Sequence, residues 1–515
     1  MAATATTVDD APGETPGPRV TVPGEVRRRL ASRLPADSTR SWVWAGLIGL
    51  IAAVLRLVSL AYPDEIIFDE VYYANEGHSM LLHGSEWDLE KNEPKFVVHP
   101  PLGKWLIGIG IKLFGFDSFG WRIAAVVAGV VSVILLIRVG RRLLGSTVLG
   151  CVAGLLLTLD GMHFVSSRTA LLDIFLMVFV LASFVCLVID RDTRRARWLQ
   201  AVEGGLDPAK ARPSFGIGWW RVSAAVLAGC ALSVKWSAVW YIATFIVLLV
   251  VWEFSTQRAA GVPGHRRWSN ERLAAAAGWM TAFGLLALGT YVVSWFGWFA
   301  DGEATYRHWL ADQGRAEWPV LGALRNLFEY HSQAYGFHTT LDAEHQYQSW
   351  PWQWLVLGRP VAYYWSDAGV CGAPSCAAEI LLLGTPLLWW TFLPALVVVF
   401  WYAMSRRDWR AWTILACSAM GIVPWFVYQL DDRTMFYFYA LPSTPFLVLA
   451  VTMMLGLVIG PSDADPTRRT VGAVVAGIYV AAVALCFLYF YPIYVGETLS
   501  YDAWHARMWL GRLWI

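Results

Sequence analysis

Charged residues are scarce in this sequence: they make up 15% of its 515 residues, whereas apolar residues make up 57%. Lysine and arginine (40) nearly balance aspartate and glutamate (39), so the chain lacks the basic excess that is typical of nucleic-acid binding. Residues 1–40 contain no sustained apolar run and therefore lack the core of a signal peptide. This composition is typical of an integral membrane protein.

Cysteine is also scarce, with seven residues in the whole chain. Five of them lie in apolar stretches, whereas Cys371 and Cys376 lie together in a long loop. This pair is a candidate for a disulfide in an oxidising compartment, and the alternative is two free thiols. A zinc site is not indicated, because no second cysteine pair accompanies the first.

The long apolar stretches predict about eleven membrane-spanning helices. They lie near residues 43–62, 121–140, 145–162, 168–189, 219–235, 236–254, 273–296, 380–404, 410–429, 436–460 and 471–491. The third and fifth stretches are short and contain glycine. The expected architecture is therefore an all-α membrane domain over residues 43–515.

The arginines predict how this domain is oriented, because basic loops prefer the cytoplasmic side of a membrane. Clusters follow every second span, at Arg138/Arg141/Arg142, Arg191/Arg194/Arg195/Arg197, Arg258/Arg266/Arg267, Arg406/Arg407/Arg410 and Arg468/Arg469. We therefore expect a multi-pass protein of the cell membrane, with residues 1–42 as a disordered cytoplasmic tail. The first outer loop (63–120), the long loop 297–379 and the tail 492–515 then share the outer face.

The segment Pro101–Phe116 is apolar enough to resemble a further span. A span there would reverse every later loop and place the arginine clusters outside the cell. We therefore predict a helix that lies in the outer membrane interface, with Lys104 and Lys112 extending their ammonium groups toward water.

Ionisable residues near the outer ends of the spans are candidates for a functional site, because a charge within a membrane is costly unless it is paired or solvated. They are Arg56, Arg122, Arg168, Asp173, Lys235, Asp431, Asp432 and Arg433, and the acidic pair Asp69-Glu70 lies in the first outer loop. Carboxylates near fixed cations suit a reaction on a phosphate-bearing substrate. Structural alternatives remain: Arg168 and Asp173 as charges at a helix entry, and Lys235 as an interfacial anchor.

These residues carry a resemblance to a known family. The sequence contains, in order, Arg56, Phe68-Asp69-Glu70-Val71-Tyr72-Tyr73-Ala74, His99-Pro100-Pro101-Leu102-Gly103-Lys104, Gly120-Trp121-Arg122, Arg168-x3-Leu172-Asp173, Ser233-Val234-Lys235-Trp236, His345-x-Tyr347-x-Ser349-x-Pro351-Trp352 with Arg359-Pro360, and Arg433-x3-Tyr437. From about residue 43 onward the chain resembles the protein O-mannosyltransferase family, in its bacterial, actinobacterial-type branch. The loop 297–379 is too short for the β-trefoil MIR domain that eukaryotic members insert there, so acceptor selection by such a domain is not implied.

The resemblance implies a GT-C glycosyltransferase fold whose outer cavity transfers a single mannose from polyprenyl-phosphate-mannose to serine or threonine. Asp69 would be the general base, and Glu70 would hold the acceptor backbone or the sugar. The residues expected around the lipid phosphate are Arg56, Lys104, Arg122, Arg168, Lys235 and Arg433. The residues expected to contact the acceptor or the sugar are Tyr73, His99, Asp173, His345, Tyr347 and Trp352. The last three lie in the long loop 297–379, which Tyr330, His331 and His338 make richer in aromatic residues and histidines.

The residue types also agree with this chemistry without reference to the family. A hydroxyl is a poor nucleophile at neutral pH, and a positioned carboxylate accelerates its attack by about 10²–10⁴-fold. Cations stabilise a departing phosphate, so one base and a cation cluster predict a single displacement with inversion. Carboxylates near phosphate can also hold Mg²⁺ or Mn²⁺, but we expect no cofactor and a metal-independent reaction.

The expected partners are the lipid-linked donor, unfolded secreted or membrane proteins as acceptors, and membrane lipids, with the secretion translocon as a further candidate. One alternative is another GT-C enzyme that moves a different sugar from a polyprenyl-phosphate donor to a glycan or lipid. A lipid or small-molecule transporter is a weaker alternative, because the sequence lacks related halves and charges near the middle of the spans.

Overall fold

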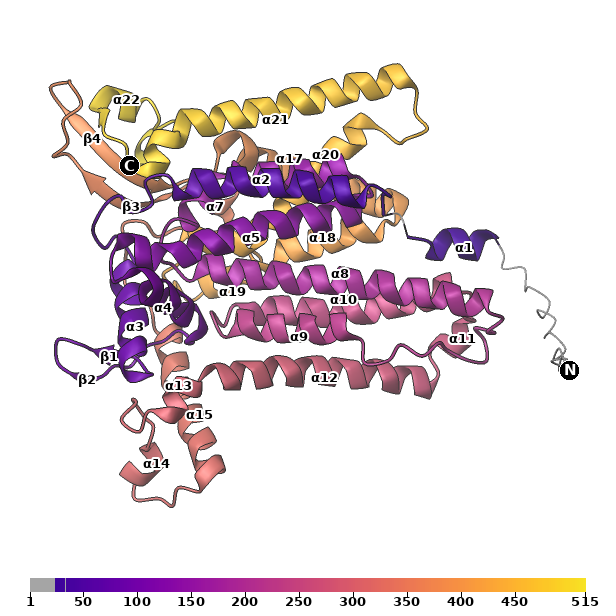
Figure 1. The fold of residues 1–515 in the computed structure, drawn as a ribbon, viewed down its shortest axis with the longest axis horizontal. Coiled ribbons are helices and arrows are strands. Elements are labelled where there is room, and N and C mark those ends of the chain that lie inside the picture. The colour runs from indigo at the N-terminus through magenta and orange to yellow at the C-terminus, as the bar shows by residue number, and fades with distance from the viewer. Residues whose placement is uncertain (1–23, 33) are drawn as a thin grey trace, which may run out of the picture.

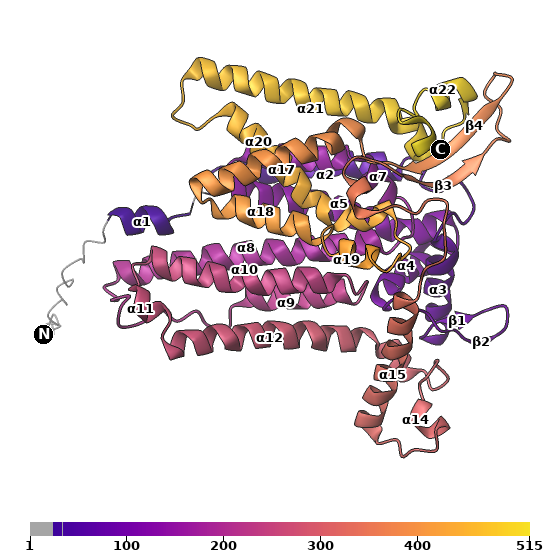
Figure 2. The same cartoon turned by 180° about the vertical axis from the view of Figure 1, so that it is seen from behind.

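Long, nearly parallel helices dominate the computed structural model, which describes residues 24–32 and 34–515 (Figures 1 and 2). In the first half, the helices are α1 (Gly24–Leu30), α2 (Ser38–Leu57), α3 (Glu70–His83), α4 (Leu102–Phe114), α5 (Ser118–Leu144), α6 (Thr147–Thr158), α7 (Gly161–Ser166), α8 (Asp173–Glu203), α9 (Trp219–Leu232), α10 (Ala238–Ala259) and α11 (Gly264–Arg267). In the second half they are α12 (Asn270–Ser294), α13 (Phe296–Ala300), α14 (Trp309–Asp312), α15 (Pro319–Thr339), α16 (Pro351–Trp354), α17 (Pro386–Arg406), α18 (Trp409–Met420), α19 (Trp425–Gln429), the 3₁₀ helix η1 (Tyr437–Ser443), α20 (Thr444–Ile459), α21 (Pro466–Val495), α22 (Tyr501–His505) and the 3₁₀ helix η2 (Gly511–Leu513).

Two small antiparallel sheets complete the structure. Strands β1 (Trp87–Asp88) and β2 (Glu93–Pro94) form a hairpin in which Trp87 faces Pro94. Strands β3 (Val361–Ser366), β4 (Cys376–Leu382) and β5 (Leu499–Ser500) pair in the order β3-β4-β5, with a bulge at Ala362/Tyr364.

Within the described residues, nine helical segments are long and apolar enough to cross a membrane, and each overlaps a predicted span. The third and fifth predicted spans correspond to α6 and α9, which are apolar but shorter. Helix α6 ends early because Asp160 starts a new helix, α7, by accepting a hydrogen bond from the backbone N–H of His163 at 3.0 Å. The all-α membrane fold is confirmed, and the count of eleven spans stays a prediction.

Helix α8 lies at the centre of the bundle. Most residues in the apolar part of α8 are buried, whereas few residues in the apolar parts of α12 and α21 are, as expected for helices that face lipid. Helices α9 and α10 both pack against α8, and the Ser183 hydroxyl of α8 donates to the Ala224 carbonyl of α9 at 2.8 Å. Since α8 begins at Asp173, this buried helix fixes one carboxylate at its N-terminal end.

The two ends of the bundle differ in content (Figure 1). Helices α3, α4, α7 and α13–α15 and the β3-β4-β5 sheet gather at one end, together with the C-terminus. Helix α1 and the connections α10–α11 and α20–α21 lie at the other end. The predicted outer loops therefore share one end, and the basic loops share the other.

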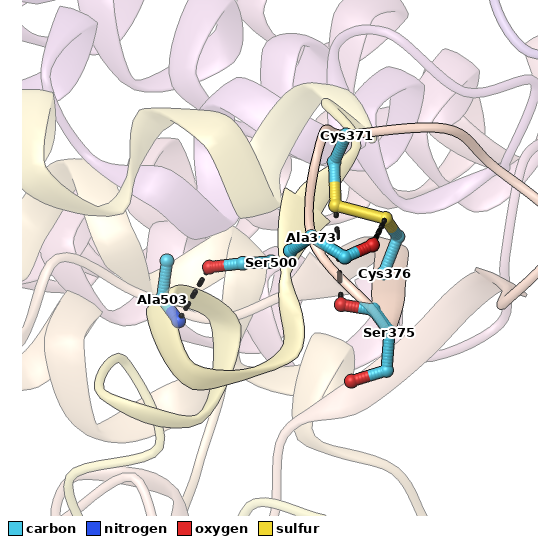
Figure 3. Close-up of a disulfide and its surroundings, with 6 residues drawn as sticks. All are labelled: Cys371, Ala373, Ser375, Cys376, Ser500 and Ala503. Carbon is cyan, nitrogen blue, oxygen red and sulfur yellow. Dashed lines mark hydrogen bonds between the residues drawn. A yellow bond between two sulfur atoms is a disulfide. The ribbon is translucent and has the colours of Figure 1, made fainter.

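Cys371 and Cys376 form a disulfide in the hairpin between β3 and β4 (Figure 3). The adjacent Ser375 carbonyl accepts a hydrogen bond from the backbone N–H of Tyr501 at 3.1 Å, and Cys376 pairs with Ser500 in the sheet. The closed hairpin thus holds the C-terminal segment.

Two sequence expectations are wrong. Residues 1–23 of the predicted disordered tail lie outside the described residues, as does Arg33, but α1 is a helix whose Leu30 is buried with Trp198 and Val202. The amphipathic spacing of Val26 and Leu30 explains this packing. In α4, Lys112 is exposed as expected, but Lys104 is fully buried and forms ion pairs with Glu86 and Glu76.

Candidate active site

Asp69 lies immediately before α3, at a distorted point of the backbone. The preceding residue, Phe68, has a positive φ of 46°, a conformation that side chains other than glycine rarely adopt. The Phe68 ring stacks on Tyr363 of β3 with ring centroids 4.6 Å apart, and Phe436 and Phe438 meet its edge. Aromatic packing therefore fixes the strained turn that positions Asp69.

The Asp69 carboxylate is partly exposed and forms no hydrogen bond or ion pair with any described residue. Burial of much of the side chain raises its pKa to about 6. The positive charge of Lys235 opposes this rise, whereas the negative charges of Asp173 and Glu76 add to it. A carboxylate without a partner and with a pKa near neutrality is suited to accept a proton.

Glu70 occupies a different environment, although it is the next residue. It is fully buried, and its two oxygens accept hydrogen bonds from Arg122 at 2.9 Å each. The Trp121 indole and the backbone N–H groups of Ala170 and Ile67 donate three more. With no exposed surface, Glu70 is placed to hold the protein together rather than to meet a substrate.

Lys235 and Asp173 form a buried ion pair at 2.7 Å. Lys235 lies in the turn between α9 and α10, and Asp173 is the first residue of α8. The Lys235 ammonium also lies over the rings of Phe438 and Tyr439, 5.6 and 5.4 Å from their centroids. Lys235 therefore has a buried carboxylate partner, which a simple anchor at the membrane interface would not need.

A cavity of about 350 Å³ opens beside this pair. Its polar lining includes His99, Asp173, Lys235, His338 and Arg433, and the remaining wall is rich in aromatic side chains, contributed by Trp236, Trp240, Tyr335, Trp425, Tyr428 and Tyr439. A small polar centre within an aromatic wall is typical of a ligand-binding site.

Arg433 is the cation in this cavity that lacks an acidic partner among the described residues. Its guanidinium donates to the backbone carbonyls of His338 (3.1 Å) and Thr434 (3.3 Å). The rings of Trp425, Tyr428 and Tyr439 surround it at 5.7–6.0 Å. Arg433 therefore keeps an uncompensated positive charge facing the cavity, as binding of a phosphate requires.

The two histidines of the cavity lie close together, with ring centroids 5.4 Å apart. Burial lowers the pKa of His99 well below its usual range and that of His338 to about 4. Both rings are therefore neutral at physiological pH. The His99 ring also lies 6.1 Å from that of Tyr73, which is buried.

The other four cations predicted near the phosphate do not line this cavity. Arg56 contacts Ser167 and His163, and Arg122 binds Glu70. Arg168 donates to the carbonyls of Arg56, Val58 and Ser59, and Lys104 is paired as described above. Each of these side chains is buried and already has protein partners.

The residues His345, Tyr347 and Trp352 also lie outside the cavity lining. The His345 ring lies 5.0 Å from Phe436, which in turn contacts Phe68, so His345 is two aromatic rings from the Asp69 turn. Tyr347 lies beside Arg359, and Trp352 is 57% exposed. The aromatic wall of the cavity was not identified from sequence, because interfacial tryptophans and tyrosines give the same signal.

No group of three or more histidine, cysteine, aspartate or glutamate side chains is arranged to hold a metal ion in the part of the chain that the structure describes.

Comparison with known proteins identifies the family. Residues 98–203 match the family model "Dolichyl-phosphate-mannose-protein mannosyltransferase", and residues 323–514 match "C-terminal four TMM region of protein-O-mannosyltransferase". The chain is 38% identical over 493 residues to a polyprenol-phosphate-mannose–protein mannosyltransferase of Mycolicibacterium smegmatis, which covers 92% of this chain and 93% of the relative. The chain belongs to the protein O-mannosyltransferase family. Relatives with the same name from Mycobacterium tuberculosis and Corynebacterium glutamicum are 37% and 31% identical, over 97% and 92% of this chain and 95% and 92% of theirs.

Solved structures show the same fold at low sequence identity. A chain of the Saccharomyces cerevisiae protein O-mannosyltransferase Pmt1-Pmt2 complex, bound to the sugar donor, matches with a TM-score of 0.73 at 15% identity, covering 95% of this chain and 94% of that one. ArnT from Cupriavidus metallidurans, bound to undecaprenyl phosphate, matches with a TM-score of 0.52 at 17% identity, covering 87% of this chain and 70% of that one. The predictions of the family, of the GT-C membrane fold and of a glycosyltransferase are confirmed.

Proposed function

We propose that this member of the protein O-mannosyltransferase family transfers mannose from a polyprenyl-phosphate donor to serine or threonine hydroxyls of protein acceptors. This chain matches its relatives over most of their own length, and their names support this donor and protein acceptors. The observation that supports the mechanism is that the Asp69 carboxylate has no partner among the described residues, while the charges of Lys235 and Asp173 influence its pKa. Asp69 itself is not part of the cavity lining, but Lys235 and Asp173 line the cavity together with Arg433.

In the proposed reaction, Asp69 accepts the proton of the acceptor hydroxyl while its oxygen attacks the anomeric carbon. The bond from that carbon to the phosphate oxygen breaks, and the electron pair leaves with the lipid phosphate. Arg433 and Lys235 stabilise the developing negative charge. Since the phosphate departs from the face opposite the attack, the configuration at the anomeric carbon inverts.

The remaining residues of the site act through these groups. Asp173 orients Lys235, and Glu70 with Arg122 holds the turn that carries Asp69. We assign neutral His99 and His338 to hydrogen bonding with the sugar or the acceptor, because neither ring carries charge at physiological pH. The aromatic wall surrounds the donor and limits access of water.

We further propose that the site faces the outside of the cell membrane, where unfolded secreted chains still expose serine and threonine. The gathering of basic loops at the opposite end supports this orientation. Mannosylation of chains during their secretion would bring the enzyme close to the secretion translocon, which we propose as a partner.

The role of Asp69 is tested by transfer of labelled mannose from a defined polyprenyl-phosphate-mannose to an acceptor peptide. Asp69→Asn should lower transfer by about 10²–10⁴-fold, because the amide cannot accept the proton. Glu65→Gln is the matched control, since Glu65 is an exposed carboxylate in the same turn. Near-normal transfer by Asp69→Asn in folded protein would remove Asp69 from the mechanism.

The proposed reaction also predicts independence from divalent metals, because two protein cations already face the leaving phosphate. Transfer should continue at its full rate when the purified protein is treated with a chelator such as EDTA. Loss of transfer in EDTA that Mg²⁺ or Mn²⁺ restores would contradict this assignment.

A further inference from the structure

A second cavity lies at the opposite end of the bundle from Asp69. It has a volume of about 680 Å³ and is lined by residues of α1, α5, α8, α10, α17 and α18. Helix α8 joins the two sites: at a rise of 1.5 Å per residue, Arg191 in this lining lies about 27 Å along the helix from Asp173. The cavity is therefore separate from the candidate active site.

Arginine dominates the lining of this cavity. Nine arginines and two aspartates line it, and no lysine, histidine or glutamate does so among the described residues. Six elements or their ends supply the arginines: α1 gives Arg28 and Arg29, α5 gives Arg142, α8 gives Arg191 and Arg195, α10 gives Arg258, α17 and its end give Arg406 and Arg407, and α18 gives Arg410. The cavity thus concentrates positive charge from segments that are far apart in the sequence.

The two aspartates neutralise only part of this charge. Asp192 pairs with Arg142 at 2.9 Å and with Arg191 at 3.1 Å, and Asp408 pairs with Arg410 at 2.6 Å.

Four arginines of the lining form no ion pair with any described residue: Arg28, Arg258, Arg406 and Arg407. Arg407 also has a positive φ of 49° where the chain turns from α17 into α18. The cavity therefore retains several cations without an anion.

The cytoplasmic preference of basic loops accounts for arginines at this end, but it does not require them to converge on one hollow. Arg468 and Arg469 lie in the first turn of α21, next to the α20–α21 connection at the same end of the bundle, and do not line the cavity. Like charges brought together repel one another, so the arrangement is most stable when a polyanion fills it. Planar guanidinium groups match phosphate oxygens closely.

We propose that this cavity binds a phosphate-rich anion, and that this anion is the headgroup of a membrane lipid that carries two phosphates. The position favours a lipid, because the cavity lies at the ends of membrane helices and its lining includes Leu30, Leu34, Leu143 and Trp409. Basic hollows between membrane helices are the usual sites for anionic headgroups. Because α1 contributes two of the arginines, the bound ligand holds α1 against α8 and α10.

The test uses the full-length protein in nanodiscs of phosphatidylcholine with or without cardiolipin, and a separate titration with inorganic diphosphate in detergent. Arg406→Gln/Arg407→Gln removes two unpaired arginines of the lining. Arg468→Gln/Arg469→Gln is the matched control, because it removes an adjacent pair from the same end outside the cavity. Thermal unfolding and native mass spectrometry report ligand binding.

We expect cardiolipin to stabilise the wild type and the control, and the lining variant to bind it at least roughly tenfold more weakly. Stabilisation by diphosphate without selectivity among lipids supports the site and assigns its ligand to the soluble pool. Equal binding by both double variants, equal loss in both, or no response to either probe would overturn the proposal. If the lining variant does not fold, Arg258→Gln replaces it.

Discussion

Asp69 and Glu70 are neighbours in the chain, but their carboxylates lie in different environments. The Glu70 carboxylate accepts five hydrogen bonds and is fully buried, whereas the Asp69 carboxylate accepts none from the described residues and Asp69 is partly exposed. The turn at Phe68 and the start of α3 cause this difference, because they direct consecutive side chains to opposite surroundings. An acidic pair in a loop can therefore contain one reactive group and one structural group.

In the proposed mechanism, the pKa of Asp69 sets the pH dependence of transfer. Only the deprotonated carboxylate accepts a proton, so kcat/KM should be full above pH 7 and fall as the pH drops through the pKa of about 6. Since the charge of Lys235 opposes the raised pKa, Lys235→Met should move the midpoint to higher pH. Lys112→Met, at an exposed position of α4, is the control with an unchanged midpoint. A profile that is flat from pH 5 to 8 would contradict the assignment.

The sequence identifies charged residues as candidates for the site, but it does not show what each one contacts. Six cations were predicted around the phosphate, and only Lys235 and Arg433 line the cavity. Arg56, Arg122 and Arg168 are also unusual near a membrane end, yet they bind carbonyls, hydroxyls and Glu70 inside the protein. A motif cannot distinguish these cases, because packing decides whether a guanidinium faces the interior or a cavity.

At the scale of elements, the pair of Glu70 and Arg122 joins the Asp69 turn to α5. Arg122 also donates to the carbonyls of Leu60, Pro63 and Glu65, so one side chain organises the whole connection from α2 to α3. A buried ion pair of this kind is sensitive to loss of one partner, because the other charge remains without compensation.

Glu70→Gln should therefore lower the free energy of unfolding by roughly 3–5 kcal/mol, with a corresponding fall in the thermal midpoint in detergent. Glu70→Gln/Arg122→Met should recover part of this stability, because it leaves no unpaired charge. Glu65→Gln provides the baseline for a carboxylate change in the same turn. Lost transfer at wild-type stability would instead mean that Glu70 contacts substrate.

The positions of the long helices could be predicted from hydropathy, because each span must supply its own apolar surface to the membrane. The short elements could not. Helix α7 depends on the cap by Asp160, and α1 depends on contacts with Trp198 and Val202 that are distant in sequence. Lys104 was misjudged for the same reason, since Glu86 and Glu76 reach it only in the folded chain.

At the scale of the whole molecule, the arginine-lined cavity and the candidate active site lie at opposite ends of the bundle of helices that Figure 1 shows. The proposed orientation can be measured with single cysteines at exposed positions of each end. Glu303→Cys, at the site end, should react with a membrane-impermeant maleimide in intact cells, and Asp463→Cys only after permeabilisation. Labelling of the wild-type protein, which has five free cysteines, gives the background signal. The reverse labelling pattern would place the site in the cytoplasm.

The unpaired charge of Arg433 also bears on how the catalytic cycle ends. A sugar phosphodiester carries one negative charge, whereas the lipid phosphate left after transfer carries roughly 1.5 to 2 at pH 7. If the lipid phosphate binds at Arg433 as proposed, a cavity that keeps this arginine without an acidic partner should hold the spent carrier more firmly than the fresh donor. With the role proposed for Arg433, we expect departure of the carrier lipid to limit turnover, so that the rate of mannosylation depends on how quickly the surrounding membrane takes up that lipid.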